Sequence, residues 1–313
     1  GNTLTYGQTE LLLLFGKIVG EANFRDCEEM KASNVGLQMM LVESSDKQLP
    51  LTQNFIRTLH RTLLREDYTV YRMLPGGVQT SYVIHAGQYK TRPNSVITRY
   101  GDRFEYASPE ETPALMADLV DWYNRAEQEG KLSPIDLAIL FHYRYIRIHP
   151  FEDGNGRIAR LMVNYILSRH GYPMIVVRSR LKQDYLEALH RADLIVGSTP
   201  ADGAHASLKD IRPFHKYMVN LICHEIGNDV LFVTEKSQDV WWYDGERIAF
   251  RTPSYGKILQ ELRREPKATL AYLQEEIGIN RSALQKLLQT LLDKHYVERD
   301  ADGSWRVFIT PSI

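Results

Sequence analysis

The chain has 313 residues, of which 43% are hydrophobic and 25% charged, and its formal net charge at pH 7 is −1. This length suits about two globular domains, and the near-neutral charge excludes a general attraction to nucleic acid or anionic lipid. Two cysteines, Cys27 and Cys223, favour reduced thiols in a cytoplasmic protein, and no apolar run approaches the length that a bilayer span needs.

Four segments before residue 149 show helical signals. The capping-box pattern at 5–8 predicts the start of a helix. Hydrophobic residues then recur at helical spacing over 52–64 and 111–128. A further helix is predicted after Ser133-Pro134, because serine can cap a helix and proline fits its first turn. We therefore expect a mainly α protein.

A non-helical region lies between these helices, from Met73 to Tyr106. It contains glycines, prolines and two alternating stretches, 95–98 and 104–106, with Gly101-Asp102 between them. Alternation on either side of a turn signal is typical of paired strands. The sequence therefore predicts a β-hairpin here.

The most informative run is His-Pro-Phe-Glu-Asp-Gly-Asn-Gly-Arg-Ile-Ala-Arg, from His149 to Arg160. Apolar residues follow it at helical spacing, so Arg157 is expected to open a buried amphipathic helix that includes Ile158, Leu161, Met162, Tyr165 and Ile166. The glycine turn would then lie at a helix N-terminus. Unpartnered N–H groups and aligned peptide dipoles favour an anion at such a place.

The residues of this turn suit phosphate groups. Gly154 and Gly156 have no Cβ, so each can adopt positive φ and let the main chain approach a phosphate. Asn155 tolerates a tight turn and adds an amide donor. Arg157 and Arg160 lie three residues apart on a helix, and could hold two successive phosphates by bidentate bonds.

Two further side chains supply chemistry. Asp153 is a hard oxygen ligand at the place where a phosphate-bound Mg²⁺ would need one. His149 has an ordinary pKa of about 6.5, so a neutral imidazole could take a proton from an attacking hydroxyl near pH 7. Phe151 is expected to be a core residue that anchors the loop. The alternative is an ordinary turn between two helices, with solvated arginines.

This run matches every specified position of His-x-Phe-x-(Asp/Glu)-Gly-Asn-Gly-Arg-x-x-Arg, and it thereby resembles the Fic family signature. The resemblance implies an enzyme that transfers AMP from ATP to a hydroxyl side chain of a protein. It implies His149 as the general base and Asp153 as the Mg²⁺ ligand. It further places Gly154, Asn155 and Gly156 at the α- and β-phosphates, Arg157 at the β-phosphate and Arg160 at the γ-phosphate.

The same resemblance assigns roles to other segments. The hairpin would be the flap, which covers the active site and aligns a target segment as an added strand; a plain surface hairpin is the alternative. In the helical segment 180–193, Tyr185 matches an aromatic beside the adenine, although it could equally be a core residue. Asp193 occupies a position where relatives place a polar adenine partner.

The first residues resemble the end of the family's inhibitory segment, Ser-x-x-x-Glu-Gly-Asn. Its glutamate pairs with the second motif arginine and displaces the γ-phosphate. Gly1-Asn2 begins just after the expected glutamate. A shortened protein would leave Arg160 unrestrained and the site more open to ATP. The alternative is that 1–5 is merely the lead-in to a helix.

The C-terminal part has a different pattern. Helical segments at 257–264, 269–277 and 281–295, and then a hairpin over 296–309, resemble a winged-helix domain with Asn280 as a helix cap. Its charge is equivocal. The third helix offers Arg281, Gln285, Lys286 and Gln289 to a DNA groove, whereas the hairpin carries Glu298, Asp300 and Asp302 beside Arg299 and Arg306. A DNA reader and a docking or dimerisation module are both consistent with it.

These predictions define a fold class and a function. The fold is a Fic-type helical domain with a β-hairpin flap (1–235), a hairpin and linker (236–255) and a small α+β winged helix-turn-helix domain (256–313). The leading function is a bacterial-type protein adenylyltransferase that uses Mg²⁺ and ATP to modify a Tyr, Thr or Ser hydroxyl of a target or of itself. The alternative is a nucleotide-sensing DNA-binding transcriptional regulator. Homodimerisation stays open, and no role at a membrane is expected.

Overall fold

The computed structural model describes residues 9, 12–13, 23–73, 77, 79–97, 103–236, 240–265 and 267–311. The predicted helix start at 5–8, the segment 1–5 and the turn Gly101-Asp102 lie outside these residues. Chain contacts divide the protein into two units, Gly1–Ile222 and Cys223–Ile313. Across the described ranges, no helix is both long and apolar enough to cross a membrane.

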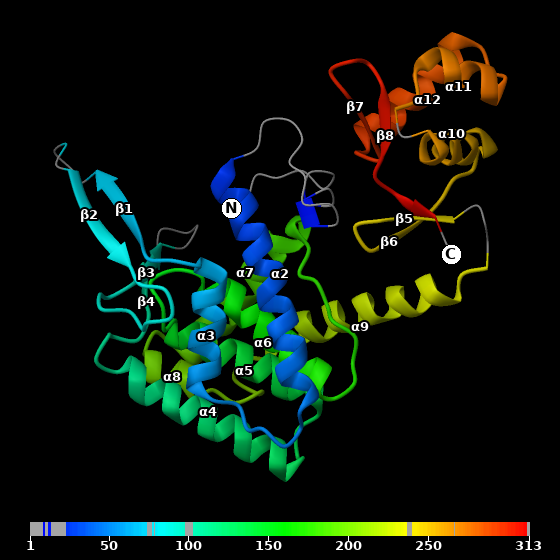
Figure 1. The fold of residues 1–313 in the computed structure, drawn as a ribbon. Coiled ribbons are helices and arrows are strands. Elements are labelled where there is room, and N and C mark those ends of the chain that lie inside the picture. The colour runs from blue at the N-terminus through cyan, green and yellow to red at the C-terminus, as the bar shows by residue number, and fades with distance from the viewer. Residues whose placement is uncertain are drawn as a thin grey trace. The chain divides into compact units, whose positions relative to one another are not determined.

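The first unit is mainly helical, as predicted. Its helices are α2 (Phe24–Ser45), α3 (Gln53–Leu64), α4 (Thr112–Glu129), α5 (Pro134–Ile148), α6 (Asn155–Arg169), the 3₁₀ turn η1 (Ser179–Leu181), α7 (Lys182–Val196), α8 (Pro200–Ala204) and α9 (Arg212–Thr234), which continues into the second unit. The helices α5 and α6 pack together at the centre, with α2, α3 and α4 around them (Figure 1). The two central helices meet at the motif.

Local sequence signals set several helix ends. The Ser133 hydroxyl accepts the Asp136 N–H at 3.0 Å, and proline occupies the first turn of α5, as predicted. The Thr52 hydroxyl caps α3 in the same way. The motif helix, however, begins at Asn155 rather than at Arg157. Gly154 adopts a left-handed conformation, with φ of 77°, and ends the loop two residues earlier than expected.

The region predicted as one hairpin contains part of a second one. The strands β1 (Tyr68–Met73) and β2 (Gln79–Ile84) pair antiparallel, and so do β3 (Ser95–Ile97) and β4 (Arg103–Glu105). The β3–β4 hairpin is the predicted one. The β1–β2 hairpin was missed because β1 lies largely before the expected region. Its side chains also alternate too little between buried and exposed to give the two-residue period of a strand.

The second unit contains the predicted winged helix. It comprises β5 (Val240–Tyr243), β6 (Glu246–Ala249), α10 (Pro253–Arg264), α11 (Leu270–Ile277), α12 (Arg281–Asp293), β7 (Val297–Arg299), β8 (Trp305–Val307) and β9 (Thr310–Pro311). The Asn280 side chain caps α12 by accepting the Ala283 N–H at 2.9 Å, as predicted. The helix ends at Asp293, two residues before the expected end.

The hairpin β5–β6 forms at its expected place but belongs to the fold of the second unit. It turns through Asp244 and Gly245, both at positive φ, as an Asp-Gly hairpin turn requires. Its strand β5 also pairs with β9, and Trp241 is fully buried in the apolar core of this unit. That core includes Ile258, Leu259, Leu262, Leu273, Leu284, Leu288 and Leu291.

Candidate active site

His149 closes α5 and faces the cavity described below. It adopts a left-handed conformation with φ of 52°, and its N–H donates to the Tyr145 carbonyl at 2.9 Å. The imidazole lies flat on the Tyr106 ring, with centroids 3.9 Å apart and planes 9° apart. Burial, helped by the charge of Lys90, lowers the pKa of His149 to about 3. The imidazole is therefore neutral at pH 7, which is the form that a general base needs.

Asn155 holds the motif loop together from inside. Its Oδ1 accepts the N–H of Phe151 at 2.9 Å, and its Nδ2 donates to the carbonyl of the same residue at 2.7 Å. The side chain is buried, with 1% of its surface exposed. The amide that was expected to face phosphate is thus used within the loop. A contact from Asn155 to a nucleotide would have to come from its main-chain N–H.

The segment just before β3 braces the same loop. The Lys90 ammonium donates to the carbonyl of Ile148 at 3.1 Å and to Asn94 Oδ1 at 2.8 Å. The Asn94 amide in turn donates to the carbonyls of His149, at 3.3 Å, and Phe151, at 3.0 Å. Carbonyls between the two motif helices are therefore satisfied by side chains about sixty residues away, as buried polar groups require.

Phe151 is the predicted anchor, and its partner is a histidine. Its ring stacks on the imidazole of His60 with centroids 3.8 Å apart. His60 Nδ1 accepts the Gly87 N–H at 2.8 Å, so Nε2 carries the proton and donates to the Asp153 carbonyl at 3.0 Å. Burial lowers the pKa of His60 to about 4, so this neutral tautomer is kept at pH 7.

The N-terminus of α6 is open to an anion. Gly154 stands at the cap position and, within the described residues, no side chain caps this end. A Cβ at Gly154 would lie 3.2 Å from Leu64 and would strain a backbone at positive φ. Gly156 does not have positive φ, contrary to expectation, because it lies within the first helical turn. A Cβ there would lie 3.3 Å from Arg160 Nη1, so this glycine leaves space beside the guanidinium.

The two motif arginines have different neighbours. Arg160 lines the cavity next to Gly156. Arg157 lies with Nη2 3.5 Å from the Asp153 carboxylate and with Nη1 3.9 Å from Glu29 of α2. Phosphate binding by Arg157 would exchange these contacts for stronger ones. The sequence predicted adjacent positions for the pair, but it gave no sign of the Glu29 contact.

Asp153 is accessible but already engaged. Its Oδ2 accepts the Tyr68 hydroxyl at 2.6 Å, and 47% of its side chain is exposed. Burial raises the pKa of Asp153, but the bonds from Tyr68 and Gly154 and the charge of Arg157 together bring it below the ordinary value. The carboxylate is thus ionised at pH 7, as a metal ligand must be. Among the described residues, no group of three or more His, Cys, Asp or Glu side chains is arranged to hold a metal ion.

The proposed base His149 and three of the predicted nucleotide residues, Gly156, Arg160 and Tyr185, line one cavity of about 420 Å³. Its walls combine a base, two arginines, a lysine and apolar side chains: Tyr106, Ile146, His149, Gly156, Arg160, Val177, Arg178, Lys182, Tyr185, Leu186 and Leu189. Arg178 and Lys182 were missed by the sequence reasoning. Lys182 precedes Tyr185 by three residues on α7, so helical spacing could have placed it on the same wall.

Tyr185 lines the cavity, whereas Asp193 does not. The Tyr185 ring lines the cavity, while its hydroxyl lies 3.0 Å from His142 Nε2, inside the core. Tyr185 is therefore both a wall and a core residue. Asp193 is not at the cavity wall. Its Oδ1 accepts the Tyr143 hydroxyl at 2.8 Å and lies 3.4 Å from the guanidinium of buried Arg147. The adenine contact of Asp193 stays a prediction.

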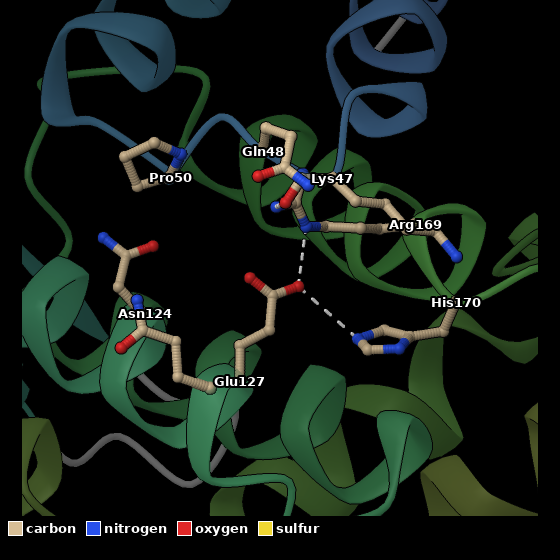
Figure 2. A pocket seen from close by; sticks show the side chains of 8 residues that line it. Lys47, Gln48, Pro50, Asn124, Glu127, Arg169 and His170 are labelled. Atoms are coloured by element: carbon tan, nitrogen blue, oxygen red, sulfur yellow. Dashed lines mark hydrogen bonds and ion pairs between the residues drawn. The ribbon is translucent and has the colours of Figure 1, made fainter.

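A second cavity, of about 500 Å³, lies between α4 and the loop 46–52 (Figure 2). Here the Arg169 guanidinium and the His170 ring both point to Glu127, at 2.6 and 3.5 Å. Arg169 also donates to the carbonyls of Asp46, Lys47 and Leu49. The guanidinium thus holds the loop 46–52 against Glu127 of α4, and we assign this cavity a structural role.

Comparison with known proteins agrees with the motif. Residues 50–167 match the Fic/DOC family, and residues 256–298 match the winged helix-turn-helix DNA-binding family. The crystal structure of a Fic domain containing signaling protein from Bacteroides thetaiotaomicron is 55% identical. It superposes with a TM-score of 0.68 over 74% of this chain and 81% of that one. The chain therefore belongs to the Fic/DOC family.

Curated relatives are more distant. Protein adenylyltransferase fic-1 from Caenorhabditis briggsae is 28% identical over 218 residues, which are 70% of this chain and 36% of that protein. The solved structure of Fic-1 from C. elegans is 26% identical, with a TM-score of 0.57 over 76% of this chain and 61% of that one. This chain spans only about a third of the length of the nematode relatives.

Proposed function

We propose that this protein is a protein adenylyltransferase, which transfers AMP from ATP to a Tyr, Thr or Ser hydroxyl of a target protein or of itself. One observation carries the proposal: the neutral imidazole of His149, the small Gly156 and the cationic Arg160 line one cavity at the N-terminus of α6. Relatives named protein adenylyltransferase, including fic-1 of Caenorhabditis briggsae, support it.

The residues suggest how the step would proceed. The target hydroxyl attacks the α-phosphorus of ATP, forms a new P–O bond and breaks the bond to pyrophosphate, which leaves. The imidazole of His149 takes the hydroxyl proton. The N–H groups of the first turn of α6, together with Arg160, stabilise the charge that develops on the phosphate oxygens. Arg157 joins them once it has left Asp153 and Glu29.

Asp153 fits a magnesium ion that arrives with the nucleotide. Mg²⁺ is usually held by one or two carboxylates and by substrate phosphates rather than by an all-protein cage. This agrees with a single ionised carboxylate and with no larger ligand cluster in the described ranges. Bound there, the ion would neutralise charge on the phosphates. The Tyr68 hydroxyl, at 2.6 Å, would keep the other ligand positions of Asp153 oriented.

The proposal is tested by labelling. The full chain is incubated with Mg²⁺ and ATP that carries its label on either the α- or the γ-phosphate, alone and with a lysate, and modified proteins are identified by mass. We expect label from the α-phosphate only, with the mass of an AMP group. Transfer from the γ-phosphate would identify phosphoryl transfer instead, and no transfer to any protein would refute the proposal.

A DNA-binding regulator is the second candidate, and one observation favours it. The acidic wing residue Asp300 forms a bidentate pair with Arg306, at 2.7 and 2.8 Å, so part of the negative charge that spoke against DNA is neutralised. Arg281 and Lys286 are exposed on α12. Binding to labelled duplex DNA, measured over a salt series with and without ATP, tests this function. Nucleotide-dependent binding without any AMP transfer would favour the regulator.

A further inference from the structure

The β3–β4 hairpin contacts His149 through both of its ends. Asn94 directly precedes β3, and its amide donates to the main-chain carbonyl of His149 at 3.3 Å. Tyr106 directly follows β4, and its ring covers the imidazole. The two ends are joined, because the Tyr106 N–H donates to the Asn94 carbonyl at 3.3 Å. One hairpin thus holds both the main chain and the ring of the proposed base.

Among the described residues, no carboxylate orients the imidazole. In a Ser-His-Asp arrangement a carboxylate accepts a hydrogen bond from Nδ1–H and fixes the ring. Here His149 Nδ1 is buried without a carboxylate partner in the described part of the chain, and the main-chain carbonyl of Ile146 lies close enough to raise the pKa of the ring. A flat aromatic ring at 3.9 Å, only 9° from parallel, restricts tilting of the imidazole toward that side. Packing by Tyr106 therefore restrains the plane of the imidazole, in addition to the main-chain carbonyl of Ile146.

We propose that Tyr106 is a positioning residue, which sets the plane of the His149 imidazole and couples it to the β3–β4 hairpin. This inference rests on the proposed function. A base must come within about 3 Å of the hydroxyl that it deprotonates, and a misplacement of about 1 Å can cost about 100-fold in rate. A target segment that pairs with β4 would contact the strand that directly precedes Tyr106. Target binding would then steady the base as well as the hydroxyl.

The test compares three substitutions of one residue in the full chain. Tyr106→Phe keeps the flat ring, Tyr106→Leu keeps apolar bulk without a plane, and Tyr106→Ala removes both. We expect the Phe variant to keep the wild-type kcat, whereas kcat of the Leu and Ala variants falls by about 10- to 100-fold. Because Tyr106 also lines the cavity, kcat is compared at saturating ATP. Tyr71→Ala, in an exposed residue of β1, is the matched control and should keep wild-type kinetics.

The pH profile gives a readout that a loss of folding would not. Without the ring, water reaches the imidazole, so the pKa of His149 rises from about 3 toward its ordinary value. A base acts only when neutral, so the acid limb of kcat moves to higher pH in the Ala variant and stays in place in the Phe variant. If the Ala variant unfolds, the comparison of kcat between the Leu and Phe variants still tests the positioning role.

The outcomes separate this inference from the proposed function. No AMP transfer by the wild-type chain overturns the proposed function. Transfer by the wild-type chain, with an undiminished kcat in folded Tyr106→Leu, overturns the positioning role alone. An equal loss in the Phe and Leu variants also overturns it, because the flat ring would then not be what matters.

Discussion

The first unit buries many charged and polar side chains, whereas the second buries mainly apolar ones. Among the described residues, the buried polar set of the first unit is Asp26, Ser44, His60, Lys90, Thr112, His142, Arg144, Arg147, Asn155 and Arg169, and that of the second is Glu225 and Ser304. Buried polar groups need satisfied partners and so specify one geometry. The first unit thereby fixes the geometry around its cavity, while the second keeps most of its polar side chains outside its apolar core.

The largest expected effect is a loss of AMP transfer in His149→Ala, which alters the first unit alone. Removal of a general base typically costs about 10²- to 10⁴-fold in rate. Nucleotide affinity, which depends on the helix N-terminus and the arginines, should change little. Rates of AMP transfer and calorimetric titration with ATP check the two expectations. A variant that keeps wild-type transfer would exclude His149 as the base.

Leu288→Ala probes the second unit alone. Leu288 is fully buried in the apolar core of that unit, so its truncation should lower the free energy of unfolding there by about 2–5 kcal/mol. Hydrogen exchange should quicken in α12 and remain unchanged in α5 and α6. Transfer of AMP should stay at the wild-type rate, and Gln285→Ala, on the exposed face, serves as the control. Loss of transfer would show that the units are coupled.

Acid should weaken the first unit before the second. His60 and His142 are buried, and burial lowers their pKa values to about 4 and about 3. The unfolded chain therefore binds more protons below about pH 6.5, so stability is full above that pH and falls as the pH drops. At pH 5 each histidine should cost about 2 kcal/mol relative to pH 7. Hydrogen exchange at both pH values should show this loss in α5, and an equal loss in α12 would contradict it.

A pair of asparagines sharpens the contrast within the first unit. Asn155 braces both main-chain groups of Phe151, and Asn124 braces both main-chain groups of Leu51, at 2.9 Å each. Replacement of either by Ala should cost about 1–3 kcal/mol of stability, because partners are left unsatisfied. Only Asn155→Ala should also slow AMP transfer. Thermal melting and transfer rates measured on both variants check this, and equal transfer by both would refute the special role of the motif loop.

Local patterns predicted much of this fold. The caps at Ser133 and Asn280, the winged helix and the β3–β4 hairpin all follow from signals within a few residues. The motif predicted that His149, Gly156 and Arg160 share one site, and these three residues line the cavity. The sequence did not predict the contacts that Arg157 makes with Asp153 and Glu29, or that Asp193 makes with Tyr143 and Arg147. The spacing of residues in the sequence predicts which side chains share a helix face. It does not predict which distant residues those side chains will contact.

The contacts that hold the loop had no local signal. Asn94 reaches His149 and Phe151, and His60 stacks on Phe151, across 55 to 91 residues of sequence. A lone asparagine or histidine gives no indication of such a partner. The stacking of Tyr106 was hidden for the same reason, because it depends on where a short strand ends in space.

The Arg169 guanidinium donates hydrogen bonds to the main-chain carbonyls of the loop after α2, at Asp46, Lys47 and Leu49. Every residue type has a main-chain carbonyl oxygen. The conformation of this loop therefore depends on one distant arginine rather than on the side chains of the loop itself. A substitution of the Lys47 side chain would leave these hydrogen bonds in place, whereas substitution of Arg169 would remove all of them.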